Sequence, residues 1–399
     1  MITRFSVSRA VVGALAFGLA ACETTVTNPG PLQDDELNTP SAIPALVNGM
    51  SGDLSAALGN YIDRGALAAG ELMEAGNFAA EQHYSTGVIR PEDVNPDWAN
   101  MQTARWSSES GLRRMQSVLG AGFESNTSTP RAYLYAGFAN RLLGENACSA
   151  VIDGGPIQSD SVYFERADSL FSRAIALATA QNNTTVKNAA IAGRASVRAA
   201  LGRWSDAAVD AALVPATFVF NAIFSTNTTR ENNDLANQTI TRRETTVYGT
   251  VYAATRSDPR TTWDTVKTTA GKVQTGQDGK TPFFRQTKYT SLGSSVPLAK
   301  GTEMLLLRAE NSLRNGDVAG AMTLINQERA SFNLAPLTAT TPAGVTTILQ
   351  AERGSVLWLE GRRLWDLRRW YAAGANSFLN GRDKCIPPSA NEVAANPNF

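Results

Sequence analysis

The sequence is poor in histidine and cysteine, and this scarcity excludes several kinds of catalytic and metal site. It has one histidine, His83, and three cysteines in 399 residues. A zinc site built on paired histidines, such as HExxH, needs two and is excluded. The signatures GxGxxG, GxxxxGK[ST] and GxSxG are also missing. The sequence therefore predicts no cofactor, no metal and no catalytic residue.

The sequence also lacks an excess of either charge. Lysine plus arginine and aspartate plus glutamate each number 36, so the formal net charge is zero. Without a field of one sign, the chain has little means of attracting nucleic acid, and we expect no such partner. Its 43% of hydrophobic residues is enough to bury a large core.

The beginning of the chain resembles a bacterial lipoprotein export signal. Two arginines precede an apolar run at residues 11–20, which is too short to span a bilayer, and the run ends in Leu-Ala-Ala-Cys. We expect residues 1–21 to be removed and Cys22 to carry lipid, including palmitate. An ordinary secretory signal with a chance cysteine is the alternative. Residues 22–40, with several prolines and threonines, predict an extended tether.

The rest of the chain has a mainly α pattern. Apolar residues recur at helical spacing, and the segment on either side of Gly202 has the small residues of a tetratricopeptide helix–turn–helix. A second such turn is Asn315-Gly316-Asp317. We expect stacked helix pairs that form a curved surface. The predicted helices here span residues 106–119, 131–145, 163–180, 185–201 and 204–213.

Residues 218–298 interrupt this pattern. They are rich in threonine and asparagine, and a turn is predicted at residues 277–279. Long irregular inserts in compact proteins are usually functional or mobile. We therefore predict one domain over residues 41–399, with a helical scaffold at 41–217 and 299–399 and a loop-rich, ligand-binding insert at 218–298.

Residues 352–370 hold three tryptophans, five arginines and three acids. We interpret them as part of one helix over about residues 346–372, packed in the core. Its spacing places Glu360 within reach of Arg363, and Asp366 within reach of Arg362 or Arg369. Arginine does not exchange protons near neutral pH, so this stretch is structural rather than catalytic.

The remaining cysteines are Cys148 and Cys385. An even pair in an exported protein indicates one disulfide, and two separate buried thiols are the alternative.

Four blocks of sequence resemble the SusD/RagB family of outer-membrane nutrient-binding lipoproteins, and they follow the order of the family. The first is Cys22 with its preceding residues, and the second is LLGENAC at 142–148. The third begins with FRQTKY at 284–289 and continues through Glu303-Met304 to Ile325-Asn326. The fourth is the charged stretch 352–370 together with GRDKCIP at 381–387 and NE and NPN between 391 and 398.

The resemblance implies four tetratricopeptide-like units with a loop-rich ligand face. It implies a non-catalytic lipoprotein on the surface of the outer membrane, acting as a lid over a SusC-like TonB-dependent transporter. Such a protein binds an oligosaccharide, or in some relatives a peptide, and delivers it for import. Glu23, rather than aspartate, follows the lipidated cysteine, which favours the outer membrane under the Gram-negative sorting rule.

Sugar binders stack aromatic rings on pyranose faces. Tyr84, Trp98 and Trp263 lie in irregular segments and are the ligand-binding candidates, with burial in the core as the alternative. Two other functions stay open. One is a tetratricopeptide-type envelope scaffold. The other is a lipid-anchored glycosidase that uses the nearby carboxylates Glu71 and Glu74.

Overall fold

The computed structural model describes residues 35–399 of the chain. The chain divides into two units, residues 1–38 and 39–399. Of the first unit only residues 35–38 are described, and they contain the short 3-10 helix η1 (Asp35–Leu37). The predicted export signal, Cys22 and most of the predicted tether lie outside the described residues.

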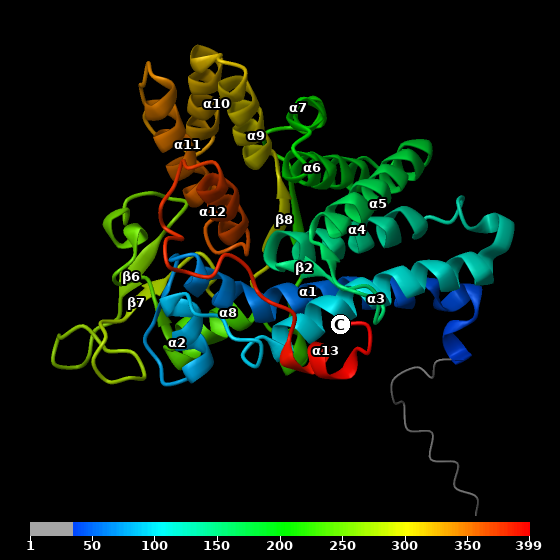
Figure 1. Cartoon of the computed structure of the whole chain (residues 1–399), viewed down its shortest axis with the longest axis horizontal. Helices are drawn as coiled ribbons and strands as arrows, with labels where there is room; N and C mark the ends of the chain where they lie inside the picture. The colour runs from blue at the N-terminus through cyan, green and yellow to red at the C-terminus, as the bar shows by residue number, and fades with distance from the viewer. Residues whose placement is uncertain (1–34) are drawn as a thin grey trace, which may run out of the picture. The chain divides into compact units, whose positions relative to one another are not determined.

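Helices dominate the unit formed by residues 39–399, as Figure 1 shows, and the expected mainly α fold class is confirmed. None of the helices described here is both long enough and apolar enough to cross a membrane. The α-helices are α1 (Ile43–Ala68), α2 (Ala79–Thr86), α3 (Asn95–Leu119), α4 (Thr129–Asn146), α5 (Ser161–Ala180), α6 (Thr184–Ala200), α7 (Trp204–Ala212), α8 (Asp234–Ala236), α9 (Gly301–Arg314), α10 (Val318–Ala330), α11 (Pro342–Val356), α12 (Arg363–Ala372) and α13 (Ala390–Ala395).

The strands are short and pair in twos, all antiparallel. The pairs are β1 (Met73–Glu74) with β5 (Thr245–Thr246), β2 (Ser149–Ala150) with β3 (Gln158–Ser159), β4 (Val219–Ala222) with β8 (Val296–Lys300), and β6 (Trp263–Thr265) with β7 (Phe284–Gln286). Short turns of helix complete the described chain: η2 (Pro40–Ala42), η3 (Gly120–Gly122), η4 (Thr229–Glu231), the π-helical η5 (Asn237–Arg242) and η6 (Val251–Ala254).

The helix pairs pack closely because small residues meet large rings. Phe171 of α5 lies between α4 and α6, and a Cβ added at Gly137 or Gly193 would come within 2.6 or 2.5 Å of its ring. Gly202, with φ +76°, turns the chain between α6 and α7. In Figure 1 helices α4–α7 lie side by side, and α9–α11 continue the arrangement beyond α7.

The prediction of a single helix over about residues 346–372 is wrong. Helix α11 ends at Val356, and α12 begins at Arg363. The turn between them needs two residues with positive φ, Leu359 at 57° and Gly361 at 69°. Gly361 also allows close approach to α1, because its added Cβ would lie 3.3 Å from a methyl group of Leu58.

Buried ion pairs connect this turn to the helical scaffold. The Arg362 guanidinium lies 2.8 Å from Glu145 on α4 and 2.9 Å from Glu303 on α9. Asp366 pairs with Arg353 at 2.9 Å and, as predicted, with Arg369 at 2.8 Å. All six side chains are at most 12% exposed. We call these residues the buried ionic network.

Glu360 does not pair with Arg363 as the helical spacing predicted. Its carboxylate lies 2.6 Å from the ammonium group of Lys288 and 2.7 Å from that of Lys300. Lys288 lies in the insert and Lys300 ends β8 just beyond it, so the turn after α11 binds the insert as well as the scaffold.

Two carboxylates of the buried ionic network are held in the charged form, whereas burial raises the pKa of a third, Glu145. Burial alone would raise the pKa of Asp366, but Arg353 and Arg369 outweigh that effect and lower it below its ordinary value. Glu303 has a lowered pKa for the same kind of reason, since Arg362 and Arg353 outweigh its burial.

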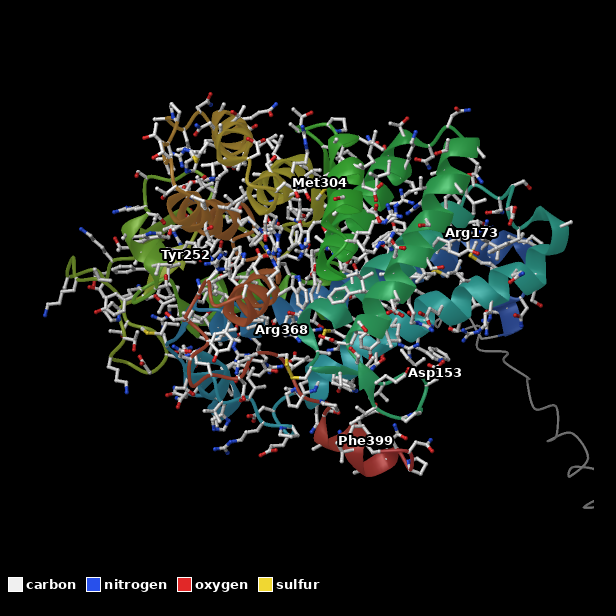
Figure 2. The ribbon with its side chains drawn as sticks, turned by 45° about the horizontal axis from the view of Figure 1, so that its top comes forward. Asp153, Arg173, Tyr252, Met304, Arg368 and Phe399 are labelled. Carbon is white, nitrogen blue, oxygen red and sulfur yellow. A yellow bond between two sulfur atoms is a disulfide. The ribbon has the colours of Figure 1, made fainter. Side chains whose placement is uncertain are left out.

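A disulfide joins Cys148 to Cys385, with 2.07 Å between the sulfur atoms (Figure 2). It links the end of α4 to the segment after α12. The backbone N–H of Cys148 also donates to the carbonyl of Ile386 at 2.8 Å. Arg368 donates one hydrogen bond to the carbonyl of Ala147 beside this bridge. The C-terminal segment is therefore fixed to the helical scaffold.

Replacing Arg362 with methionine should lower the free energy of unfolding by about 3–5 kcal/mol, because Glu145 and Glu303 lose their nearest counter-charge while remaining buried. Denaturant unfolding measures the loss. The matched control is Arg203→Met, since Arg203 forms an exposed pair with Asp206 at 2.9 Å that should contribute at most about 1 kcal/mol. Equal losses in the two variants would contradict the importance of the buried ionic network.

Candidate functional site

The insert meets the segment after α1 at a cleft of about 380 Å³, which we call the loop cleft. Its lining carries mostly amide, hydroxyl and charged groups. The lining residues are Met73, Glu74, Gly76, Asn77, Gln82, Ser85, Thr86, Asp278, Lys280 and Thr281.

Backbone pairing between distant segments builds the loop cleft. In the β1–β5 pair, Met73 lies opposite Thr246. The N–H of Asp278 donates to the carbonyl of Ala75 at 2.9 Å, and the amide of Asn77 donates to the carbonyl of Gln277 at 3.2 Å. The insert is therefore attached directly to the segment that follows α1.

The predicted turn at residues 277–279 forms one wall of the loop cleft. Asp278 accepts hydrogen bonds from the backbone N–H groups of Lys280 and Thr281, and Gly279 has φ +71°. An aspartate that accepts from residues further along the chain stabilises such turns. The side chain of Asp278 therefore stabilises the turn that forms this wall.

The carboxylates of Glu74 and Glu244 both lie against Gly76, beneath the loop cleft. A Cβ added at Gly76 would lie 1.8 Å from a carboxylate oxygen of Glu244 and 2.7 Å from one of Glu74. No larger residue fits at Gly76 while these side chains stay in place. Glu74 and Glu244 each have one buried oxygen without a hydrogen-bond partner among the described residues.

The loop cleft favours a neutral Glu74. Burial, followed by the nearby Asp63, raises the pKa of Glu74 to about 8. Burial also raises the pKa of Asp63 to about 7. Glu244 keeps a guanidinium partner, Arg242, at 3.1 Å. A protonated Glu74 can donate a hydrogen bond into the loop cleft.

Two partly exposed aromatic side chains adjoin the loop cleft. Phe78, 46% exposed, directly follows Asn77 and precedes α2, and the Arg242 guanidinium lies 5.0 Å from its ring centroid. Tyr248, 39% exposed, follows β5, and a Cβ added at the neighbouring Gly249 would touch Met73. Rings beside a hydroxyl- and amide-rich pocket suit a ligand that has both apolar faces and many hydroxyl groups.

The structure argues against the three predicted aromatic candidates, because all of them are buried. Tyr84 is 0% exposed and donates to Asp97, and Trp98 is 2% exposed and donates to Glu392. Trp263 stacks on Phe284 with ring centroids 4.5 Å apart, and Arg256 lies over its ring. None offers a free ring face to a ligand.

The carboxylate pair considered for glycoside hydrolysis does not form. Glu71 is 1% exposed and accepts the backbone N–H of Leu359, so it faces the core rather than the loop cleft. Burial raises the pKa of Glu71 to about 8. His83 lies 2.7 Å from Asp93. Within residues 35–399, no cluster of histidine, cysteine and acidic residues is arranged to hold a metal ion.

Sequence reasoning missed Phe78 and Tyr248. The signal near Phe78 was available, since Gly76-Asn77 is a turn-forming pair directly before a helix. Nothing near Tyr248 marked it, because residue spacing does not show that β5, which it follows, pairs with the distant β1.

A model of the SusD family matches residues 222–391, which include most of the insert and the buried ionic network around α12. No curated protein gives a match. Many solved structures share the fold, and their descriptions name the same family. Residues 222–391 therefore resemble the SusD family, and the described chain has the fold of SusD-like proteins.

Three members of the family illustrate the likeness. A SusD superfamily protein from Bacteroides thetaiotaomicron VPI-5482 has a TM-score of 0.69 at 14% identity, over 90% of this chain and 97% of that one. One from Bacteroides vulgatus ATCC 8482 has a TM-score of 0.64 at 14% identity, with the same coverage. A laminarin-binding SusD-like protein has 0.65 at 14% identity, over 90% of this chain and 100% of its own. At such identities the likeness establishes the family fold.

Replacing Glu74 with glutamine should increase stability relative to the unmodified protein, and the gain should grow from pH 5 to pH 8. In the folded protein Glu74 keeps its proton up to a pKa of about 8, whereas an unfolded glutamate loses it near 4.5. The folded state therefore binds more protons in this window, and its free energy of unfolding falls as pH rises. Glutamine carries no ionisable proton, so the variant does not lose this part of its free energy of unfolding as pH rises.

Urea unfolding of both proteins at several pH values measures the difference. The control is Glu92→Gln, at an exposed position outside the loop cleft. A gain that is constant with pH, or one that Glu92→Gln reproduces, would contradict the proposed protonation of Glu74.

Proposed function

We propose that this protein is a non-catalytic nutrient-binding lipoprotein that holds an oligosaccharide in the loop cleft. The observation that carries the proposal is the loop cleft itself. Hydroxyl and amide groups line its interior. The partly exposed Phe78 follows the lining residue Asn77, and the partly exposed Tyr248 precedes Gly249, which lies close to Met73. Sugar rings present polar edges and apolar faces, and this combination of side chains matches both.

The comparisons support a carbohydrate more than a peptide. One structural relative is described as laminarin binding, which supports the class of ligand. The lining of the loop cleft includes a single large apolar residue, Met73, so it lacks the apolar pockets that usually bind peptide side chains. We therefore favour an oligosaccharide, and a peptide is the alternative outcome of a binding screen.

The start of the sequence and the resemblance to the SusD/RagB family support a proposed cellular role. We propose that residues 1–21 are removed, that Cys22 is lipidated, and that residues 22–40 tether the domain to the outer surface of the outer membrane. From there the protein would deliver its ligand to a SusC-like TonB-dependent transporter. A periplasmic tetratricopeptide scaffold and a glycosidase are the alternatives.

Alanine at both Phe78 and Tyr248 should weaken oligosaccharide binding about 5- to 150-fold, because two stacking contacts worth roughly 0.5–1.5 kcal/mol each are lost. Calorimetry with glucan, mannan, xylan and galactan hexasaccharides measures the affinity. The matched control is Leu213→Ala, which removes a 61% exposed apolar side chain after α7.

Three results would count against the proposal. Unchanged affinity in the double variant would exclude the loop cleft, and binding of peptides alone would exclude the sugar. Release of reducing sugar by the purified protein would favour the glycosidase alternative.

Serine at Cys22 should abolish incorporation of labelled palmitate and release the protein from the membrane fraction. Protease added to intact cells should cleave the unmodified protein if it lies on the cell surface. Solubilised outer membranes should yield a large β-barrel receptor bound to it. Complete protection from the protease, with no receptor recovered in any detergent, would instead support the periplasmic scaffold.

A further inference from the structure

A second concave surface lies along α3, and we call it the α3 groove. It consists of two cavities, of about 260 and 480 Å³. The first is lined by Gln102, Arg105 and Trp106 of α3, with Asp153 and Glu392 from elsewhere in the chain. The second is lined by Glu109 and Arg113 of α3, with Arg166 of α5.

The two cavities share one face of α3. Residues 102, 105, 106, 109 and 113 follow one another at intervals of one, three or four, which places them on one side of a helix. Arg105 and Arg166 both pair with Glu109, at 3.0 and 2.5 Å, so an ion-paired ridge lies between the cavities. The groove is therefore one elongated surface.

Trp106 is the exposed ring of the α3 groove. Its side chain is 55% exposed, the largest exposure of any tryptophan among the described residues. It makes no hydrogen bond, ring contact or cation–π contact with any residue between 35 and 399. An unpartnered tryptophan beside a pocket exposes apolar area at a cost, and binding a ligand on its face would offset that cost.

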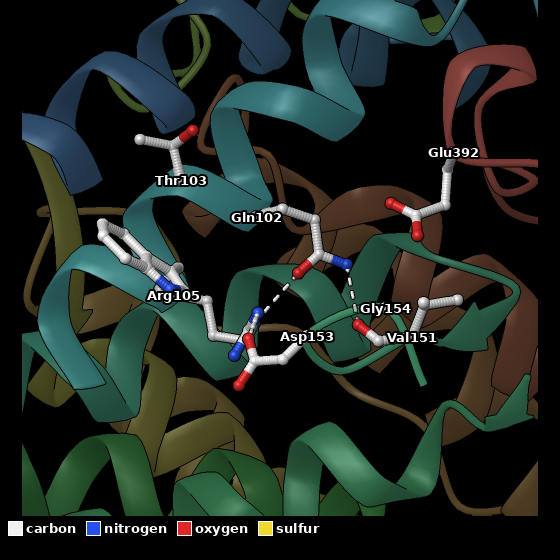
Figure 3. Close-up of a pocket in the computed structure, with 8 residues that line it drawn as sticks. Gln102, Thr103, Arg105, Val151, Asp153, Gly154 and Glu392 are labelled. Atoms are coloured by element: carbon white, nitrogen blue, oxygen red, sulfur yellow. Dashed lines mark hydrogen bonds and ion pairs between the residues drawn. The ribbon is translucent and has the colours of Figure 1, made fainter. Parts of the chain in front are cut away.

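The polar wall beside Trp106 is held in place. Gln102 accepts from Arg105 at 2.9 Å and donates to the carbonyl of Val151 at 3.0 Å, as the dashed lines in Figure 3 show. Arg105 donates to Asp153 at 2.7 Å, and Asp153 remains 47% exposed at its side chain. A ligand hydroxyl would meet groups that are already oriented.

Acidic and basic side chains are mixed in the α3 groove, with four carboxylates and three arginines. Its arginines at 105, 113 and 166 face the carboxylates at 109, 153, 165 and 392. A phosphate or a polyanion would meet more acids than bases, so the groove suits an uncharged ligand with many hydroxyl groups. The smaller cavity, at 260 Å³, lies below the range of about 300–1,000 Å³ typical of drug-sized ligands, which suits a single ring.

We propose that the α3 groove is a second carbohydrate-binding site, with one sugar ring stacked on Trp106 and its hydroxyl groups bonded to Asp153. This extends the proposed function, since it assumes the same class of ligand, but the site is separate in the chain from the loop cleft. The two sites would bind different parts of a long glycan, or two chains.

Fluorine NMR of the full lipidated chain in detergent tests the proposal, after labelling with 5-fluorotryptophan. The variant Trp106→Phe identifies the Trp106 resonance, and the other tryptophans are internal controls. We expect that resonance to shift saturably with at least one of the glucan, mannan, xylan or galactan hexasaccharides. The shift should persist when Phe78 and Tyr248 are both alanine.

Asp153→Asn provides a second measurement. Asp153 has φ 51°, a conformation that asparagine also adopts, so this variant should keep its fold. It should raise the apparent Kd at Trp106 about tenfold, through loss of a hydrogen bond to a charged group. Thermal unfolding checks that the fold is unchanged.

The proposal is overturned if no hexasaccharide moves the Trp106 resonance, or if the shift vanishes in the Phe78 and Tyr248 double variant. It is also overturned if Asp153→Asn has no effect on Kd. A Trp106 shift without calorimetric binding at the loop cleft would support the α3 groove while refuting the loop cleft as the site.

Discussion

The rest of this structure depends on pairing the charges buried around the turn between α11 and α12. Arg362 holds Glu145 and Glu303, which belong to helices far apart in the sequence. A buried charge without its partner costs several kcal/mol, so only an arrangement that brings α4, α9, α11 and α12 together at once satisfies this segment. Apolar packing tolerates many small displacements, whereas this network does not, and it fixes how the two halves of the scaffold meet.

The same turn contacts the segments on both sides of the loop cleft. The backbone N–H of Leu359 donates to Glu71, only two residues before Met73 enters the β1–β5 pair. Glu360 binds Lys288 and Lys300 of the insert and its boundary strand. Both sides of the loop cleft are thus anchored to one rigid point, although the residues that line it belong to loops. A site on a firm base needs less ordering when its ligand binds.

The helices were largely predictable, because apolar periodicity and the Gly202 turn depend on neighbouring residues. The contacts that decide function were not. Residues 352–370 have good helical spacing, yet Glu360 finds lysines from the insert, and Leu359 and Gly361 adopt positive φ. Aromatic residues in irregular segments proved to be core, since irregular backbone does not imply exposure. Tyr248 follows β5, which pairs with the distant β1, and residue spacing carries no information about that pairing.

The disulfide closes a span of 237 residues that contains no other cysteine. Three cysteines allow three possible pairings, and a lipidated Cys22 would have no thiol left to exchange. Oxidation would then have a single product, with no wrong bridge to be reshuffled during export. The thiol of Cys148 would have to stay reduced until Cys385 is made. In this way, modification of the first cysteine would protect the pairing of the other two.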